Sequence, residues 1–286
     1  MKPLVIAHRG FSGRYPENTL AAIRAAIRIG VDFVEIDVQE TADGQLIVFH
    51  DYRLNRICGV PGRVRDNTAA RIRELNPAVP TLAEVLRTCR GKTRVLIEIK
   101  RATPTKVAAA IGRHRMQHQV IVFTFSQRQL TDFAAVAPTI PRFALLEKPQ
   151  WRSSAPTVGG LAVNYRHLRT RRTVTQLQER GWQVFAWTVN SRPALRRLAE
   201  WGVDGLITNF PDRALLERRQ RAPGRAGSGL ARGTGLGMLR ACCRSSSATS
   251  VPGNSPPCRG RCKLNCWMGS KSCRRISKKP TRNTAS

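Results

Sequence analysis

Acidic residues are scarce in this chain of 286 residues, in which 18 Asp and Glu stand against 49 Lys and Arg and give a net charge of +31. No apolar run reaches the roughly 20 residues that a membrane-spanning helix needs. The N-terminal stretch MKPLVIAHRG is too short, and becomes polar too soon, for a signal peptide. The sequence also lacks Gly-rich dinucleotide-binding and P-loop motifs, which argues against those nucleotide-binding classes.

Cysteine is nearly absent from the first 220 residues, where only Cys58 and Cys89 occur. Two cysteines provide no disulfide framework, so we expect a reducing, cytoplasmic setting. The other six follow Gln220, in a segment with 14 Lys and Arg but no Asp or Glu. Its apolar residues have no strand or helix period, and burying them cannot offset the entropy lost on ordering. We therefore divide the chain into a folded domain, residues 1–220, and a disordered, basic, Cys-containing tail, residues 221–286.

Three interpretations of this tail remain open. The spacing Cys258-x3-Cys262-x3-Cys266 could hold a metal, although it lacks the two-residue gap that is typical of zinc sites. The positive charge could bind nucleic acid or another anionic surface without specificity. The abrupt loss of acidic residues is also what a shifted reading frame would produce, in which case the tail has no selected function.

Apolar runs of strand length alternate with helical patterns along residues 1–220. We predict eight strands, at Leu4–His8, Phe33–Gln39, Arg94–Lys100, Val120–Phe125, Arg142–Leu146, Gly160–Asn164, Gln183–Val189 and Gly205–Thr208. Helical patterns lie between them, at Thr19–Ile29, Thr81–Cys89, Thr105–Arg115, Gln127–Ala135, Thr173–Arg180, Pro193–Trp201 and Pro211–Arg219. Asn18 and Ser191 are the expected N-caps of two of these helices.

This alternation indicates an α/β protein with a parallel sheet covered by helices. Eight such units in about 220 residues predict a closed (β/α)8 TIM barrel. An open, doubly wound sheet is the alternative. The segment between Leu146 and Gly160 is the weakest part of the barrel prediction, because it leaves room for only a short helix.

One more strand-like run, Leu46–His50, follows Phe33–Gln39 too closely for a parallel crossover. We therefore predict a small β-hairpin inserted after the second strand, with Asp43-Gly44 as a two-residue type I′ turn. In that register Asp37 lies directly opposite His50, and their side chains point to the same face. The hairpin would return His50 to the mouth of the barrel beside Asp37.

Ionisable residues gather at the C-terminal ends of the first three predicted strands, where barrel active sites are built. Alternate residues of a strand share a face, so the apolar residues between them face the helices. The ionisable set comprises His8, Arg9, Glu35, Asp37, Glu98 and Lys100. Burying so many charges at one end of a barrel is unfavourable unless they have a function.

The residue types in this set indicate a chemistry. Three converging carboxylates repel each other unless a divalent cation lies between them, and all-oxygen ligands suit Mg²⁺ or Ca²⁺ rather than zinc. Arg9 and Lys100 suit a phosphate. His8 and His50 supply an acid and a base whose ordinary pKa values lie near neutrality. Together they indicate metal-dependent cleavage of a phosphodiester.

At these residues the chain resembles the glycerophosphodiester phosphodiesterase family. The matching stretches are AHRGFSGRYPENTLAAI (7–23), FVEIDVQETADGQLIVFHDYRLNR (33–56), VPTLAEVL (79–86), VLIEIK (95–100), VFTF (122–125), FAWTVN (185–190) and GVDGLITNFPD (202–212). They follow the family order over about residues 3–217, which leaves the tail outside the resemblance.

The resemblance implies a hydrolase that releases an alcohol and glycerol 3-phosphate. It implies metal ligands Glu35, Asp37 and Glu98, the acid–base pair His8 and His50, phosphate-binding Arg9 and Lys100, supporting Glu17 and Asn18 near the metal, and Trp187 beside the glycerol of the substrate. In the family, a substrate hydroxyl next to the phosphate attacks it, and water opens the resulting cyclic phosphate. The sequence leaves the head group, the choice between Mg²⁺ and Ca²⁺ and the oligomeric state open.

Two other functions are weighed against this one. A related barrel phosphodiesterase, such as a phospholipase or nuclease, would use the same constellation on another diester. A non-catalytic protein could bind anions or nucleic acid through its positive charge. We expect no specific nucleic-acid partner, because the basic residues are spread over helices and tail and no aromatic stacking surface is evident.

Overall fold

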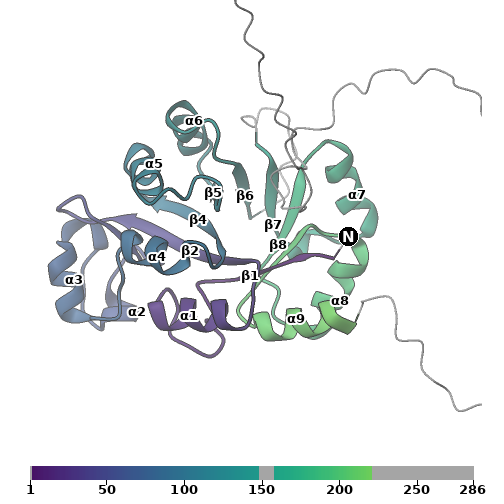
Figure 1. The fold of residues 1–286 in the computed structure, drawn as a ribbon, viewed down its shortest axis with the longest axis horizontal. Coiled ribbons are helices and arrows are strands. Elements are labelled where there is room, and N and C mark those ends of the chain that lie inside the picture. The colour runs from purple at the N-terminus through teal and green to yellow at the C-terminus, as the bar shows by residue number, and fades with distance from the viewer. Residues whose placement is uncertain (1, 148–157, 221–286) are drawn as a thin grey trace, which may run out of the picture. The chain divides into compact units, whose positions relative to one another are not determined.

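The eight predicted apolar runs form eight parallel strands, which curve into a barrel with helices on its outside (Figure 1). The structure is a computed structural model that describes residues 2–147 and 158–220. The predicted tail, residues 221–286, and most of the link between Leu146 and Gly160 lie outside the described residues.

The elements follow one another in strand–helix order. The strands are β1 (Leu4–Ala7), β2 (Phe33–Glu40), β3 (Leu46–Val48), β4 (Arg94–Arg101), β5 (Val120–Thr124), β6 (Arg142–Leu146), β7 (Gly160–Asn164), β8 (Gln183–Trp187) and β9 (Gly205–Thr208). The α-helices are α1 (Leu20–Arg28), α2 (Asn55–Cys58), α3 (Ala69–Leu75), α4 (Leu82–Cys89), α5 (Pro104–Arg113), α6 (Gln127–Val136), α7 (Arg171–Glu179), α8 (Arg192–Trp201) and α9 (Pro211–Gln220). Two 3-10 turns are η1 (Val64–Asp66) and η2 (Tyr165–His167).

Pairing between β1 and β2 closes the barrel. β1 also pairs with β9, and the strands run in the order β1-β9-β8-β7-β6-β5-β4-β2. The short strand β3 pairs antiparallel with the C-terminal end of β2. The predicted TIM barrel is confirmed, and its strand boundaries agree with the structure to within two residues. The alternative of an open, doubly wound sheet is wrong.

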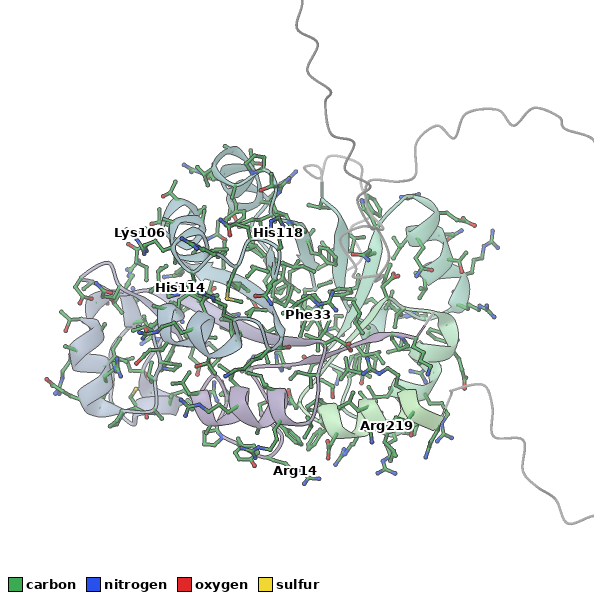
Figure 2. All side chains as sticks on the ribbon, in the orientation of Figure 1. Arg14, Phe33, Lys106, His114, His118 and Arg219 are labelled. Atoms are coloured by element: carbon green, nitrogen blue, oxygen red, sulfur yellow. The ribbon has the colours of Figure 1, made fainter. Side chains whose placement is uncertain are left out.

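Three phenylalanines fill the N-terminal end of the barrel interior. The ring of Phe185 lies 6.5 Å from that of Phe33 and 4.7 Å from that of Phe143, centroid to centroid. A Cβ on Gly160 or Gly205 would come within 2.5 or 2.7 Å of one of these rings, so the packing excludes larger residues there. Figure 2 shows Phe33 in the middle of the ribbon. This floor leaves the C-terminal end of the barrel as its open end.

The hairpin formed by β2 and β3 is present, but its predicted register is wrong by one residue. Val38 pairs with Val48. The amide of Phe49 donates a hydrogen bond of 2.9 Å to the carbonyl of Asp37, where the prediction had His50. Because side chains alternate along a strand, His50 is not the direct cross-strand partner of Asp37.

The turn explains the shift. The amide of Gly44 donates to the carbonyl of Thr41 at 2.9 Å, and the amide of Thr41 donates to the carbonyl of Gln45 at 3.0 Å. Only Gly44 adopts a positive φ, 74°, so the loop has three residues and not the two of a type I′ turn. The hydroxyl of Thr41 also accepts a hydrogen bond of 3.1 Å from the amide of Gln45.

The segment after the hairpin contains α2, η1 and α3, which were not predicted. Together with β3 it forms a small apolar cluster apart from the main core, composed of Ile47, Phe49, Leu54, Val64, Ala69, Ile72 and Val79. Gly59 ends α2 with a left-handed φ of 73°. The cluster fixes both the return segment of the hairpin and the short helix that carries Arg56.

One predicted helix cap is wrong and another is only half right. The hydroxyl of Thr19, not the side chain of Asn18, caps α1 and accepts a hydrogen bond of 3.2 Å from the amide of Ala22. Ser191 does occupy the N-cap of α8, but its hydroxyl makes no capping hydrogen bond within the described chain.

As for membrane insertion, every helix in the described ranges is too short or too polar to span a bilayer.

Candidate functional site

Three buried carboxylates meet at the C-terminal ends of β2 and β4. Glu35 and Asp37 lie on β2, Glu98 lies on β4, and the strand register places Asp37 directly beside Glu98. Side-chain oxygens of the three residues lie within 4.8 Å of one another. The residues are only 1%, 1% and 8% exposed, so water screens their mutual repulsion poorly.

Burial and the charges of neighbouring groups give the three carboxyl groups different pKa values. Burial, and then the neighbouring Asp37 carboxylate, raise the pKa of Glu98 to about 7. The same two causes hold the pKa of Glu35 well above its usual range. Burial acts on Asp37 in the same direction, but the cations of Arg9 and Lys100 outweigh it and leave the pKa of Asp37 lowered. Without a further cation, the cluster therefore retains protons near neutral pH.

This cluster fits a divalent cation. The buried oxygen Oδ1 of Asp37 accepts no hydrogen bond from any described residue, and its nearest cation is Nζ of Lys100 at 3.5 Å. Oxygen ligands with unfilled lone pairs are what Mg²⁺ and Ca²⁺ bind in proteins. A bound dication would also favour the ionised form of Glu35 and Glu98.

The loop between β1 and α1 holds two non-glycine residues in the left-handed region, Arg9 at φ 55° and Asn18 at φ 58°. Both are fixed by the carboxylates. The amide of Arg9 donates to Oε2 of Glu35 at 2.8 Å, and Nδ2 of Asn18 donates to Oδ2 of Asp37 at 2.9 Å. Left-handed non-glycine residues persist only where their surroundings enforce them, which is common at functional sites.

Two cations lie against the carboxylates. Nζ of Lys100 is 2.8 Å from Oε1 of Glu98, and Nε of Arg9 is 3.3 Å from Oδ2 of Asp37. Burial lowers the pKa of Lys100, but Asp37 and Glu98 outweigh this effect and raise it overall. Lys100 therefore stays charged and, with Arg9, gives the site two partners for an anionic phosphate.

His8 follows β1 and has a fixed tautomer. Its Nδ1 lies 2.6 Å from Oδ1 of Asn209, an oxygen that can only accept, so Nδ1 carries the proton. The other nitrogen, Nε2, lies 3.9 Å from Oε2 of Glu35 and is available for proton transfer. Burial, followed by the charge of Arg9, lowers the pKa of His8 to about 4.

His50 lies just beyond β3 on a segment that Gln39 holds in place. The buried Nε2 of Gln39 donates to the carbonyls of Phe49 and Asp51 at 2.8 and 2.7 Å. The ring nitrogen Nδ1 of His50 lies 2.7 Å from Oδ1 of Asp51, which leaves Nε2 for proton transfer. Burial lowers the pKa of His50, although the charge of Asp37 opposes this.

Both histidines border one cavity of about 240 Å³ at the open end of the barrel. Its other charged lining residues are Arg9, Glu35, Glu98, Lys100 and Glu147, and Trp187 also lines it. Trp187 lies on β8 and makes an edge contact with Phe125, with ring centroids 5.9 Å apart. Since Phe125 is 52% exposed, this aromatic pair forms part of the rim.

The structure brings all ten predicted site residues into one connected set. Asp37, Glu17 and Asn18 do not border the cavity. Asp37 belongs to the carboxylate cluster, and the other two hold residues that form the site. Oε1 of Glu17 accepts a hydrogen bond of 2.9 Å from Nη1 of Arg9. Asn18 binds Asp37 from the side of the loop.

Four further residues of the site were missed. They are Gln39, Asp51, Arg56 and Asn209. Gln39 lies two residues after Asp37 on the same face of β2, so strand periodicity could have found it. Asp51 directly follows His50, which is a weaker signal. Arg56 and Asn209 reach the site only through the tertiary fold.

Glu17, His50 and Asp51 form a second group of close ligand atoms in the described chain. It is not free for a metal, because the guanidinium of Arg56 bridges Glu17 and Asp51 at 2.7–3.0 Å. His114 and His118 belong to neither of these two groups. Figure 2 shows His114 on the side of α5.

Comparisons with known proteins agree with this geometry. The sequence profile of the glycerophosphoryl diester phosphodiesterase family matches residues 8–213. The chain belongs to this family. Its members are phosphoric diester hydrolases that depend on a divalent metal ion, which accords with the carboxylate cluster.

Individual family members support the assignment. YhdW of Bacillus subtilis (strain 168) is 34% identical over 231 residues, which cover 73% of this chain and 95% of the relative. A glycerophosphodiester phosphodiesterase of the same strain is 32% identical over 247 residues, covering 73% and 84%. The solved structure of an Oleispira antarctica phosphodiesterase, in complex with the product sn-glycerol-3-phosphate, matches with a TM-score of 0.67 at 25% identity, covering 76% and 96%.

Proposed function

We propose that this chain hydrolyses glycerophosphodiesters to an alcohol and glycerol 3-phosphate, with His8 and His50 as its acid–base pair. The observation that supports this most is that two imidazoles, two cations and two carboxylates, Glu35 and Glu98, border one cavity, with the buried Asp37 carboxylate clustered beside these two. Ion pairs that only stabilise a fold do not require carboxyl groups with raised pKa values. They also do not require two neighbouring histidines whose Nε2 atoms remain available for proton transfer. Perturbed groups gathered in a cavity are typical of catalytic sites.

Glu35, Asp37 and Glu98 would hold the divalent ion, which would be Mg²⁺ or Ca²⁺. When bound, the ion supplies positive charge that stabilises the negative charge developing on the phosphate oxygens. Asn18 keeps Asp37 in place through its hydrogen bond of 2.9 Å. Arg9 adds a backbone donor to Glu35 at 2.8 Å.

The remaining residues bind the substrate. The side chains of Arg9 and Lys100 lie beside the carboxylates with exposed fractions of 17% and 10%, so they can contact a phosphate at the mouth. Glu17 orients Arg9 through its Oε1. Trp187 lies on the aromatic part of the wall, where its ring can pack against the glycerol of the substrate.

Proton transfers follow the pattern that the family resemblance implies. The glycerol hydroxyl next to the phosphate attacks phosphorus; Nε2 of one histidine accepts its proton, and the other histidine protonates the departing alcohol oxygen. Water then opens the cyclic phosphate with the two histidines in exchanged roles, which releases glycerol 3-phosphate and restores both rings. Because the attacking hydroxyl belongs to the substrate, its effective concentration is high.

A coupled assay of glycerol 3-phosphate release tests this function. Glycerophosphodiesters with different head groups would be compared, with and without a chelator. We expect release from at least one of them, loss of activity in chelator, and recovery on adding Mg²⁺ or Ca²⁺. Activity that persists in excess chelator would exclude the metal, and turnover of phospholipid or RNA alone would favour the related phosphodiesterases. We also propose a cytoplasmic location, supported by the unpaired Cys58 and Cys89.

A further inference from the structure

Arg56 links the two halves of the site although it does not border the cavity. Its Nη1 and Nη2 donate to the two oxygens of Glu17 at 3.0 and 2.7 Å. Its Nε and Nη2 donate to the two oxygens of Asp51 at 2.7 and 2.8 Å. The guanidinium group of Arg56 thus binds the Glu17 carboxylate along one of its edges and the Asp51 carboxylate along another. We propose that Arg56 is a positioning residue that sets the orientation of both Arg9 and His50, an inference that rests on the function proposed above.

The first series of contacts leads from Arg56 through Glu17 to Arg9, the proposed phosphate-binding cation. Oε1 of Glu17 accepts from Arg56 at 2.7 Å and from Arg9 at 2.9 Å, so it lies between two guanidinium groups. On its other side Arg9 lies 3.3 Å from Oδ2 of Asp37. Without Glu17 held in place, the side chain of Arg9 would be drawn towards the carboxylate cluster and away from the substrate.

The second series of contacts leads from Arg56 through Asp51 to His50. Oδ1 of Asp51 accepts from Nη2 of Arg56 at 2.8 Å and lies 2.7 Å from Nδ1 of His50. A carboxylate at Nδ1 fixes the tautomer and stabilises the imidazolium when Nε2 takes up a proton. The hydrogen bonds from Arg56 and from His50 hold the pKa of Asp51 below its usual range, so this partner stays ionised.

The geometry separates this network from an ordinary surface ion pair. The side chain of Arg56 is 50% exposed, and a single pair at such exposure stabilises a protein little. Here both carboxylates are held in the two-bond fork geometry that only arginine provides, and each makes a further contact to a residue that borders the cavity. Arg56 lies 39 residues from Glu17 in the sequence, so the contact depends on how α2 packs.

The test measures kcat, KM, the Kd of glycerol 3-phosphate and the melting temperature for a set of variants. Glu17→Gln should raise KM and the Kd about tenfold, the effect of losing one charge-assisted hydrogen bond. Asp51→Ala should lower kcat about tenfold and leave the Kd unchanged. Arg56→Gln should do both, whereas Arg53→Gln, an exposed arginine of the same segment, should do neither.

Two further variants exclude a merely structural role. Arg56→Lys keeps the charge but cannot hold two carboxylates at once, so we expect it to show both defects with an unchanged melting temperature. It also carries the test if Arg56→Gln does not fold. In the Asp51→Ala background, Arg56→Gln should lower kcat by less than about twofold while still raising the Kd, because its route to His50 is already cut.

The outcomes are distinct. If the wild type releases no glycerol 3-phosphate from any glycerophosphodiester, the proposed function fails. If the wild type is active and Arg56→Lys matches it, or Arg56→Gln matches Arg53→Gln, the function stands and the positioning role is overturned. A full kcat effect of Arg56→Gln in the Asp51→Ala background would likewise overturn it.

Discussion

Metal removal should reveal the repulsion within the carboxylate cluster as a loss of stability at high pH. In the metal-free protein, burial and the charge of Asp37 raise the pKa of Glu98 from 4.5 to about 7. A carboxyl with a higher pKa in the folded state stabilises the fold fully below pH 4.5, and this contribution is lost as the pH rises through about 7. The loss is about 3 kcal/mol, because one pKa unit corresponds to about 1.4 kcal/mol.

His8 acts with the opposite sign in an overlapping range of pH. Burial lowers its pKa from 6.5 to about 4, so on acidification the unfolded chain takes up this proton first. The free energy of unfolding therefore rises with pH between about 4 and 6.5 on account of His8. The two contributions nearly cancel in the profile of the wild type alone. His8 is present in both the wild type and Glu98→Gln. The difference between their free energies of unfolding therefore isolates the contribution of the Glu98 carboxyl.

The assay is thermal unfolding in chelator between pH 4.5 and 8.5. Relative to the wild type, Glu98→Gln should gain about 3 kcal/mol from the lower to the higher pH, or roughly 6–12 °C in melting temperature for a domain of this size. Adding Mg²⁺ or Ca²⁺ at pH 8 should stabilise the wild type more than the variant. Glu74→Gln, which removes an exposed carboxylate on α3, is the matched control. A difference between wild type and Glu98→Gln that does not change with pH would refute the reasoning.

Three further predictions are simpler. Replacing His8 or His50 by Ala should lower turnover by about 10²–10⁴-fold with the fold retained, and a loss below threefold in both would exclude their roles. Gly10→Ala should destabilise the protein by at least about 2 kcal/mol, because φ at this position is 76° and the added Cβ would lie 2.7 Å from the carbonyl carbon of Ala22. The control is Gly30→Ala, where φ is 78° and no atom lies within 4 Å of the added Cβ, so that only the backbone strain remains. Truncation after Gln220 should leave an active barrel that melts cooperatively, as expected if residues 1–220 fold alone.

Strand periodicity predicted the acidic part of the site because that part is local. Glu35, Asp37 and Glu98 alternate with apolar residues that pack under the helices, and parallel pairing then places Asp37 beside Glu98. Neither step needs knowledge of distant contacts. The same period would have added Gln39 to the set, and it was missed because an uncharged amide gave no chemical reason to select it.

The errors lie where tertiary hydrogen bonds decide the structure. Asp43-Gly44 favours a two-residue turn in isolation, but the hydroxyl of Thr41 bonds within the loop and the amide of Ala42 donates to the carbonyl of Asn67 at 2.9 Å. This shifts the register by one residue. His50 still reaches the site because it lies beyond β3, where Gln39 and not the strand ladder holds the chain. The prediction of its position was thus right for a partly wrong reason.

The charge balance of the site explains why its parts must occur together. Three carboxylates oppose the two cations Arg9 and Lys100, and the metal-free cluster resolves the excess by retaining protons, as the raised pKa values of Glu35 and Glu98 indicate. A dication would change the formal sum of these five groups from −1 to +1, which favours binding of an anionic phosphodiester. Removing one carboxylate or one cation shifts this balance by a full charge in a poorly screened site, so single substitutions there should alter metal and substrate binding together.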